Sequence, residues 1–309
     1  LTHAPVLKQI LDSQTDSYRM GRALYLADRE AKIRDVTVPD LAADPDDSLG
    51  FLALRPRSAT FFQRGATRHL RLPDAAQDLP YTFWNAPDDT RARLLVILPG
   101  VGSHRLSTGV LALAELFHLR GWSVITLSST LHPDFFLSLP GVDLPGDFRR
   151  DAEAIRLAIT HAVADFSQQP TGQAPESISV LGYSLGAINP LFLAGLEENG
   201  RLGQLTVDHY VAINPPVNPV HALRQIDVFF DIPRAWPDPE QQAEELFLRL
   251  DVVINKLRGQ KPPTPQPLPV TREESHFLIG FNLRLALADA ICASQKRHNL
   301  GIMQHDPAA

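Results

Sequence analysis

The stretch SVLGYSLGAINP, residues 179–190, places Ser184 between two glycines, directly after an apolar run and directly before a run of small residues that predicts a helix. Its centre, GYSLG, fits the pattern G-x-S-x-G, in which Gly182 and Gly186 permit a tight turn from a strand into a helix. Such a turn would expose the Ser184 hydroxyl above a sheet. Because a serine hydroxyl is a poor nucleophile near neutral pH, it needs a general base and donors for the oxyanion. Ser184 is therefore the candidate nucleophile.

Two backbone N–H groups are the candidate oxyanion donors. Leu185 would stand at the start of the predicted helix, where unpaired N–H groups and the helix dipole favour negative charge. The second donor should follow the strand predicted over 93–100, in the loop PGVGSH, residues 99–104, whose glycines let the backbone approach a ligand. We nominate the N–H of Val101 as that donor.

The same loop invites a second interpretation, as a nucleotide site. GVGSHR, residues 100–105, also lies between a strand and a helix, as a dinucleotide-binding fingerprint does. The third glycine of the fingerprint is replaced by Arg105, and Ser128 and Ser129 stand where an acidic ribose ligand is expected. No phosphate-binding G-x-x-x-x-G-K-[ST] motif occurs. Nucleotide binding is therefore disfavoured, and we expect no cofactor.

Metal sites are disfavoured as well. The single cysteine, Cys292, excludes an internal disulfide and a multi-thiolate metal site, and its apolar neighbours predict a buried helix position. In the acidic stretch 41–50, side chains that could bind calcium occur at every second position, as they do in a calcium-binding loop. However, Leu49 stands where such a loop has glycine, and Arg55 stands where it has glutamate. We predict an Asp/Pro turn there and no metal.

Strands alternate with helices through the middle of the chain. The predicted strands cover 68–73, 81–87, 93–100, 122–129, 177–182 and 205–216, and the predicted helices cover 108–121, 146–166 and 186–200. This alternation predicts an α/β fold, with a mostly parallel sheet and helices on both faces.

After Pro216 the strand pattern stops, and helices are predicted over 243–257 and 273–295, with a proline-rich linker between them. We predict an irregular or helical N-terminal cover over residues 1–60, an α/β core over 61–218, and a helical, lid-like region over 219–309. Phenylalanines of the last region would line an acyl pocket under a lid, or alternatively form a plain core: Phe229, Phe230, Phe247, Phe277 and Phe281.

Composition bounds the class of protein. The 309 residues are 44% hydrophobic and 21% charged, and the formal charge of −6 shows no block of like charge, which argues against a nucleic-acid partner. No run approaches the eighteen or so apolar residues of a membrane helix, so we expect a soluble protein without an integral membrane segment. Because the sequence starts with Leu1, a removed export signal and a trimmed cytoplasmic protein are equally compatible with it.

The chain resembles the α/β-hydrolase superfamily of serine hydrolases over about residues 68–216. LVILPGVGSH is similar to the oxyanion strand and loop, and VLGYSLGA to the nucleophile elbow. The resemblance implies a Ser, acid and His triad in that chain order, with the histidine after the last strand and no cofactor or metal. It also implies a small-molecule substrate with an ester or other acyl bond.

The sequence departs from this pattern after Ser184. Only one convincing strand follows, 205–213, and its exit offers Asn214 and Asn218 but no carboxylate. The acid and the base of the triad therefore stay unassigned, and we expect the chain to end before the final strands of the fold. The remaining candidates fall in helical or turn sequence and are more typical of surface or core positions: His221, Asp227, Asp231, His276 and His298.

We expect a hydrolase of carboxylic ester or related acyl bonds that forms an acyl-enzyme on Ser184. The alternatives are a binding scaffold that kept the turn but lost its base, and an acyltransferase, which would use the same serine. His104 and His132 follow two strands on the side where Ser184 should emerge, so either would be placed to touch substrate, or else both are ordinary solvent-facing residues.

Overall fold

The computed structural model describes residues 54–75, 77–87, 93–138, 145–168, 174–198, 205–257 and 269–298. The chain divides into two compact units, whose described parts we call the sheet unit (up to Ala222, and from Leu285 onward) and the helical unit (Leu223–Arg284). The acidic stretch 41–50 and most of the cover predicted over 1–60 lie outside the described residues. The three-part division predicted from the sequence stays a prediction.

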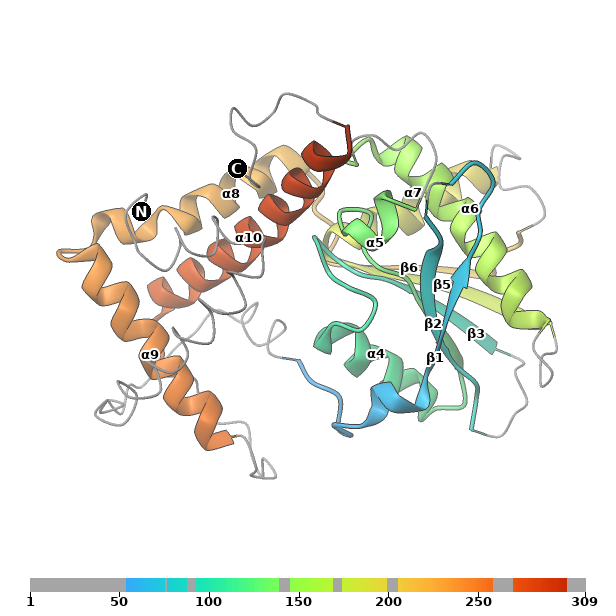
Figure 1. The fold of residues 1–309 in the computed structure, drawn as a ribbon, viewed down its shortest axis with the longest axis horizontal. Coiled ribbons are helices and arrows are strands. Elements are labelled where there is room, and N and C mark those ends of the chain that lie inside the picture. Colours follow the sequence, from blue (N-terminus) through green and yellow to red (C-terminus); the bar gives the residue numbers. More distant parts are fainter. Residues whose placement is uncertain are drawn as a thin grey trace. The chain divides into compact units, whose positions relative to one another are not determined.

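The sheet unit is built on six strands in the order β1-β2-β4-β3-β5-β6 (Figure 1). Their bounds are Ala66–Leu70 for β1, Leu79–Trp84 for β2, Arg93–Leu98 for β3, Ser123–Thr126 for β4, Ser177–Tyr183 for β5 and His209–Ile213 for β6. β2 runs antiparallel to both of its neighbours, whereas β4, β3, β5 and β6 are mutually parallel. The mostly parallel sheet predicted from the sequence is confirmed.

Helices cover both faces of this sheet. The three long ones are α4 (Thr108–His118), α6 (Phe148–Ser167) and α7 (Ile188–Glu198). Because successive side chains of a strand point to opposite faces, neighbouring residues of β3 enter different cores. Val96 packs in a cluster with α6 and α7, and Ile97 packs in a second cluster with α4. Three short turns complete the unit: η1 (Phe61–Arg64), α5 (Pro133–Phe136) and η2 (Ser184–Ala187).

The helical unit has its own core. It takes in most of α8 (Pro219–Phe230), η3 (Ile232–Ala235), α9 (Pro239–Leu257) and the first half of α10 (Arg272–His298). Phe277 is 1% exposed, and its ring lies 6.2 Å from that of Phe247 and 5.8 Å from that of Phe281, measured between centroids. These three rings contact one another within the unit, which favours the plain-core interpretation for them.

The helix α10 is longer and more apolar than expected from the sequence, which predicts no run apolar enough to span a membrane. By length and composition, the segment Arg272–Gln295 would suffice to cross a membrane. Its most apolar window has a mean hydropathy of 1.5, and 28% of that window is buried inside the protein. A single helix of this kind is weak evidence, since core helices pass the same test. Cys292 lies on α10 as predicted, but it is half-buried rather than buried.

Candidate functional site

Ser184 lies at the carboxyl end of β5, at the start of η2, which leads into α7. Its φ angle is 54°, in the left-handed region that serine rarely adopts, while the preceding Tyr183 is extended. The change of direction between these two residues leaves Ser184 exposed, although Tyr183 before it and Gly186 after it are buried. The tight strand-to-helix turn predicted from the pattern is therefore present.

The two glycines of the pattern are required by close backbone contacts. A Cβ atom on Gly182 would lie 2.1 Å from the carbonyl oxygen of Gly186, and a Cβ atom on Gly186 would lie 2.2 Å from that of Pro99. Any side chain at either position would displace the backbone, so the turn can pack against the end of β3 only with glycine at both.

The loop after β3 meets the turn at Gly100. A Cβ atom on Gly100 would lie 3.0 Å from the Cβ of Ser184 and 3.3 Å from its Oγ. Val101 follows Gly100 in this loop and is half-buried, as is Leu185 on the other side of the serine. The N–H of Leu185 belongs to the first turn of η2, where helical N–H groups have no partner in the helix. The structure thus brings the two predicted donor segments next to Ser184.

A mostly parallel sheet with helices on both faces, and a serine exposed on a sharp turn at the carboxyl end of a central strand, define the fold. It is an α/β-hydrolase fold. No protein-family model matches the sequence, and no curated protein is significantly similar to it.

Solved structures with similar architecture include Est1E from Butyrivibrio proteoclasticus, with 13% identity, a TM-score of 0.36, and coverage of 53% of this chain and 56% of that one. An esterase of Pyrococcus furiosus has 13% identity, a TM-score of 0.38, and coverage of 80% and 85%. A probable hydrolytic enzyme of Pseudomonas aeruginosa PAO1 has 14% identity, a TM-score of 0.37, and coverage of 77% and 67%. At these values the similarities assign no activity to this chain.

His104, which follows the loop at Gly100, has both ring nitrogens engaged. Its Nδ1 accepts a hydrogen bond from the N–H of Leu106 at 3.1 Å, and its Nε2 lies 3.1 Å from Oδ2 of Asp134. Nη1 of Arg105, a group that can only donate, also lies 2.8 Å from Nε2. In this arrangement neither nitrogen of His104 is left to take a proton from Ser184.

His132 is also held by Asp134, through the backbone of that residue. Its Nδ1 accepts from the N–H of Asp134 at 3.1 Å and so caps α5, and its ring centroid lies 5.2 Å from that of His104. Burial lowers the pKa of His132, and the charge of Arg105 acts in the same direction, so the imidazole is neutral near pH 7.

Asp134 is the centre of this cluster and was not singled out in the sequence. It pairs with Arg105, whose backbone N–H donates to Oγ of Ser128 at 3.0 Å. Burial would raise the pKa of Asp134, but the hydrogen bond from His104 and the charges of His132 and Arg105 outweigh it and lower the pKa to about 2. The carboxylate is thus ionised, and it joins the loops after β3 and β4.

The more distant triad candidates all lie on helices or in turns, as predicted. His221 is exposed on α8, and His276 on α10 stacks on Phe229 with ring centroids 4.3 Å apart. Asp227 pairs with Arg284 at 3.1 Å. Asp231 precedes η3, and His298 is the last residue of α10.

The two asparagines after β6 have different positions. Asn214 directly follows the strand and has a φ of 48°. Tyr183 pairs with Ile213 in the parallel strands β5 and β6, so the next residues along these strands, Ser184 and Asn214, lie beside each other. Asn218 accepts a hydrogen bond from the N–H of His221 at 3.0 Å and caps α8. Asn214 is therefore the one of the pair that lies at the site.

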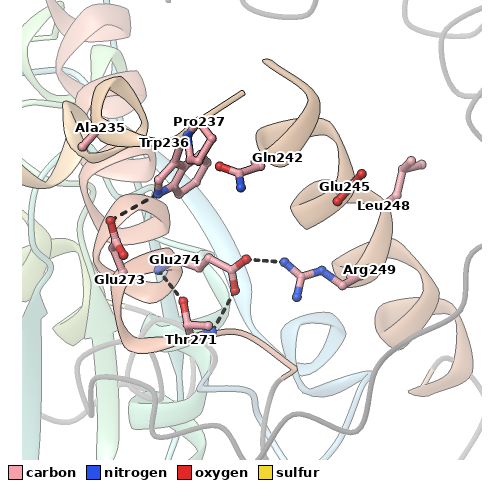
Figure 2. A pocket seen from close by; sticks show the side chains of 10 residues that line it. All are labelled: Ala235, Trp236, Pro237, Gln242, Glu245, Leu248, Arg249, Thr271, Glu273 and Glu274. Carbon is pink, nitrogen blue, oxygen red and sulfur yellow. Dashed lines mark hydrogen bonds and ion pairs between the residues drawn. The ribbon is translucent and has the colours of Figure 1, made fainter. Parts of the chain in front are cut away.

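A separate pocket of about 640 Å³ lies within the helical unit, among η3, α9 and the start of α10 (Figure 2). Charged side chains that line it are bonded to polar neighbours. Glu274 pairs with Arg249 and accepts from the N–H of Thr271 at 2.8 Å, and Glu273 accepts from the indole N–H of Trp236 at 3.2 Å (Figure 2). These bonds tie α10 to η3 and α9. In the described residues, no group of three His, Cys, Asp or Glu could hold a metal ion.

Proposed function

We propose that this protein is a hydrolase of carboxylic ester or related acyl bonds, with Ser184 as the nucleophile. The observation that carries the proposal is the exposed serine with a φ of 54° at the carboxyl end of β5, against which the glycine loop of β3 packs. Strained backbone at an exposed, chemically competent side chain is typical of functional positions, because only the surrounding packing maintains it.

In the proposed reaction, Oγ of Ser184 attacks the carbonyl carbon while a general base takes its proton. The carbonyl oxygen becomes an oxyanion, which would accept hydrogen bonds from the N–H groups of Val101 and Leu185. Collapse of this intermediate breaks the bond to the alcohol, which leaves with the proton. Water then attacks the acyl-enzyme by the same route and regenerates the serine. No step of this reaction requires a cofactor or a metal.

The base and the acid come from outside the described residues in this proposal. Two observations support that inference. The nitrogens of His104 are both engaged, as stated above, and Nδ1 of His132 is engaged as well. In addition, β6 pairs only with β5 in the described part of the chain, and its Val211 is 39% exposed, so the sheet has room for a further strand beside it. The lid role of the helices between 219 and 300 stays a prediction.

The test is labelling of the purified chain with a fluorophosphonate probe, with Ser184→Ala as the matched variant and the melting temperature as a control for folding. Labelling of the wild type that disappears in the variant supports the proposal. Equal labelling of both proteins contradicts it. No labelling of a folded wild type favours the alternative of a binding scaffold without a base. Hydrolysis in water compared with transfer to an added alcohol then separates a hydrolase from an acyltransferase.

A further inference from the structure

The chain after β4 holds both ends of the loop that follows β3. The N–H of Leu127 donates to the carbonyl oxygen of Ile97, inside β3, at 3.4 Å. The N–H of Ser129 donates to the carbonyl oxygen of Ser103 at 2.9 Å. The two donors are two residues apart, whereas the two acceptors are six residues apart. Residues 98–102 therefore form a loop between two fixed points.

This loop lies next to the nucleophile. A Cβ atom on Gly100 would be 3.3 Å from Oγ of Ser184. The N–H of Ser103 donates to the carbonyl oxygen of Gly100 at 3.2 Å, so Gly100 is connected directly to a fixed end of the loop. Val101 lies between these two residues, and among the described residues its N–H has no hydrogen-bond acceptor. This N–H is available to an oxyanion, and its position depends on how the ends of the loop are held.

The hydroxyl of Ser128 fixes the backbone just after this loop. Ser128 is 2% exposed, and its Oγ accepts a hydrogen bond from the N–H of Arg105 at 3.0 Å. The same Oγ donates to Oδ2 of Asp134 at 3.2 Å, so its hydrogen points at the carboxylate and a lone pair is left for Arg105. The guanidinium of Arg105 also binds Asp134 and Oγ1 of Thr82, but it lies at the end of a long side chain. Ser128 is thus the residue that holds the backbone of Arg105.

We infer that Ser128 is a positioning residue, whose hydroxyl holds the end of the loop and thereby keeps the N–H of Val101 in place beside Ser184. The inference rests on the proposed function of Ser184 and deepens it. An oxyanion is stabilised best by donors that are already in place before the reaction, because no reorganisation is then needed. Donor placement matters, since displacements of about 1 Å cost on the order of a hundredfold in rate.

The chain offers a matched pair of variants for the test. Ser128→Ala removes the acceptor for the N–H of Arg105. Ser138→Ala is the control, since Ser138 is 1% exposed and its hydroxyl donates to the backbone carbonyl oxygen of Asp134 at 2.8 Å instead. Three quantities are measured for each variant: the melting temperature, the hydrogen-exchange rate of the Arg105 amide, and the rate of fluorophosphonate labelling of Ser184. Labelling over a range of probe concentrations separates binding of the probe from its reaction with the serine.

We expect Ser128→Ala to slow the reaction with Ser184 about tenfold and to speed exchange of the Arg105 amide by a similar factor. Ser138→Ala should leave both rates within about twofold of the wild type, although it also loses a buried hydroxyl and its melting temperature should fall by a similar amount. Unchanged labelling of Ser128→Ala, or equal slowing in both variants, overturns the inference. If the wild type itself does not label, the proposed function fails, and exchange of the Arg105 amide alone decides whether Ser128 holds the loop.

Discussion

Gly100 and Ser184 lie so close that a methyl group on the glycine would be 3.0 Å from the serine Cβ and 3.3 Å from its Oγ. The two residues come from different strands, β3 and β5, which pair directly and in parallel. Their proximity places the loop donor and the nucleophile within one small volume at the carboxyl end of the sheet.

Gly100→Ala should therefore lower fluorophosphonate labelling at least tenfold, because the new methyl group crowds the attacking oxygen, while the melting temperature falls only a few degrees. Gly195→Ala is the control on α7, where a Cβ atom meets nothing within 4 Å. That variant should label like the wild type. Full reactivity of Gly100→Ala would show that this contact does not limit access to Ser184.

Ser184→Gly should abolish labelling and raise the free energy of unfolding by about 1 kcal/mol, since glycine adopts a φ of 54° without strain. Ser184→Ala removes the same hydroxyl but keeps a Cβ, so it should abolish labelling without this gain. Urea unfolding of the three proteins measures the difference. Equal stability of the glycine and alanine variants would mean that the turn stores no backbone strain.

Asp151→Asn should stabilise the protein by about 2 kcal/mol at pH 7 and by much less at pH 4. Asp151 is 3% exposed near the start of α6, and burial raises its pKa to about 6, although the N–H of Gly146 donates to it at 3.0 Å. A raised carboxyl pKa means that the folded state holds a proton that the unfolded state has lost, so stability falls as the pH rises from about 4 to about 6.

The check is the free energy of unfolding of wild type and Asp151→Asn at several pH values across that window. Asp78→Asn, which breaks an exposed ion pair with Arg71, serves as the control for loss of a surface carboxylate. A difference between wild type and Asp151→Asn that does not grow with pH would contradict burial as the cause of the raised pKa.

Asp134→Asn should act in the opposite sense and destabilise the protein by about 2 kcal/mol at neutral pH. Because the pKa of Asp134 is lowered to about 2 in the folded state, its contribution is present above pH 4 and is lost as the pH falls through 2. The loss relative to wild type should thus shrink below pH 4. As a control, Asp227→Asn breaks an exposed ion pair and should change stability by less than about 1 kcal/mol at neutral pH.

The sequence by itself determined the sheet, the turn and Ser184. The strands β3, β4 and β5 were readable because buried parallel strands are continuous apolar runs, and the turn was readable because its close contacts admit only glycine at positions 182 and 186. The short helix α5 was not predicted, since four residues are too few for a periodic pattern.

Only the tertiary structure decided which side chains meet at the ends of the strands. Asp134 has no motif that marks it as the partner of His104 and Arg105. Such contacts join loops that are distant in sequence. They depend on the parallel register of β4, β3 and β5, which brings the carboxyl ends of these strands to one edge, and local periodicity does not encode that register.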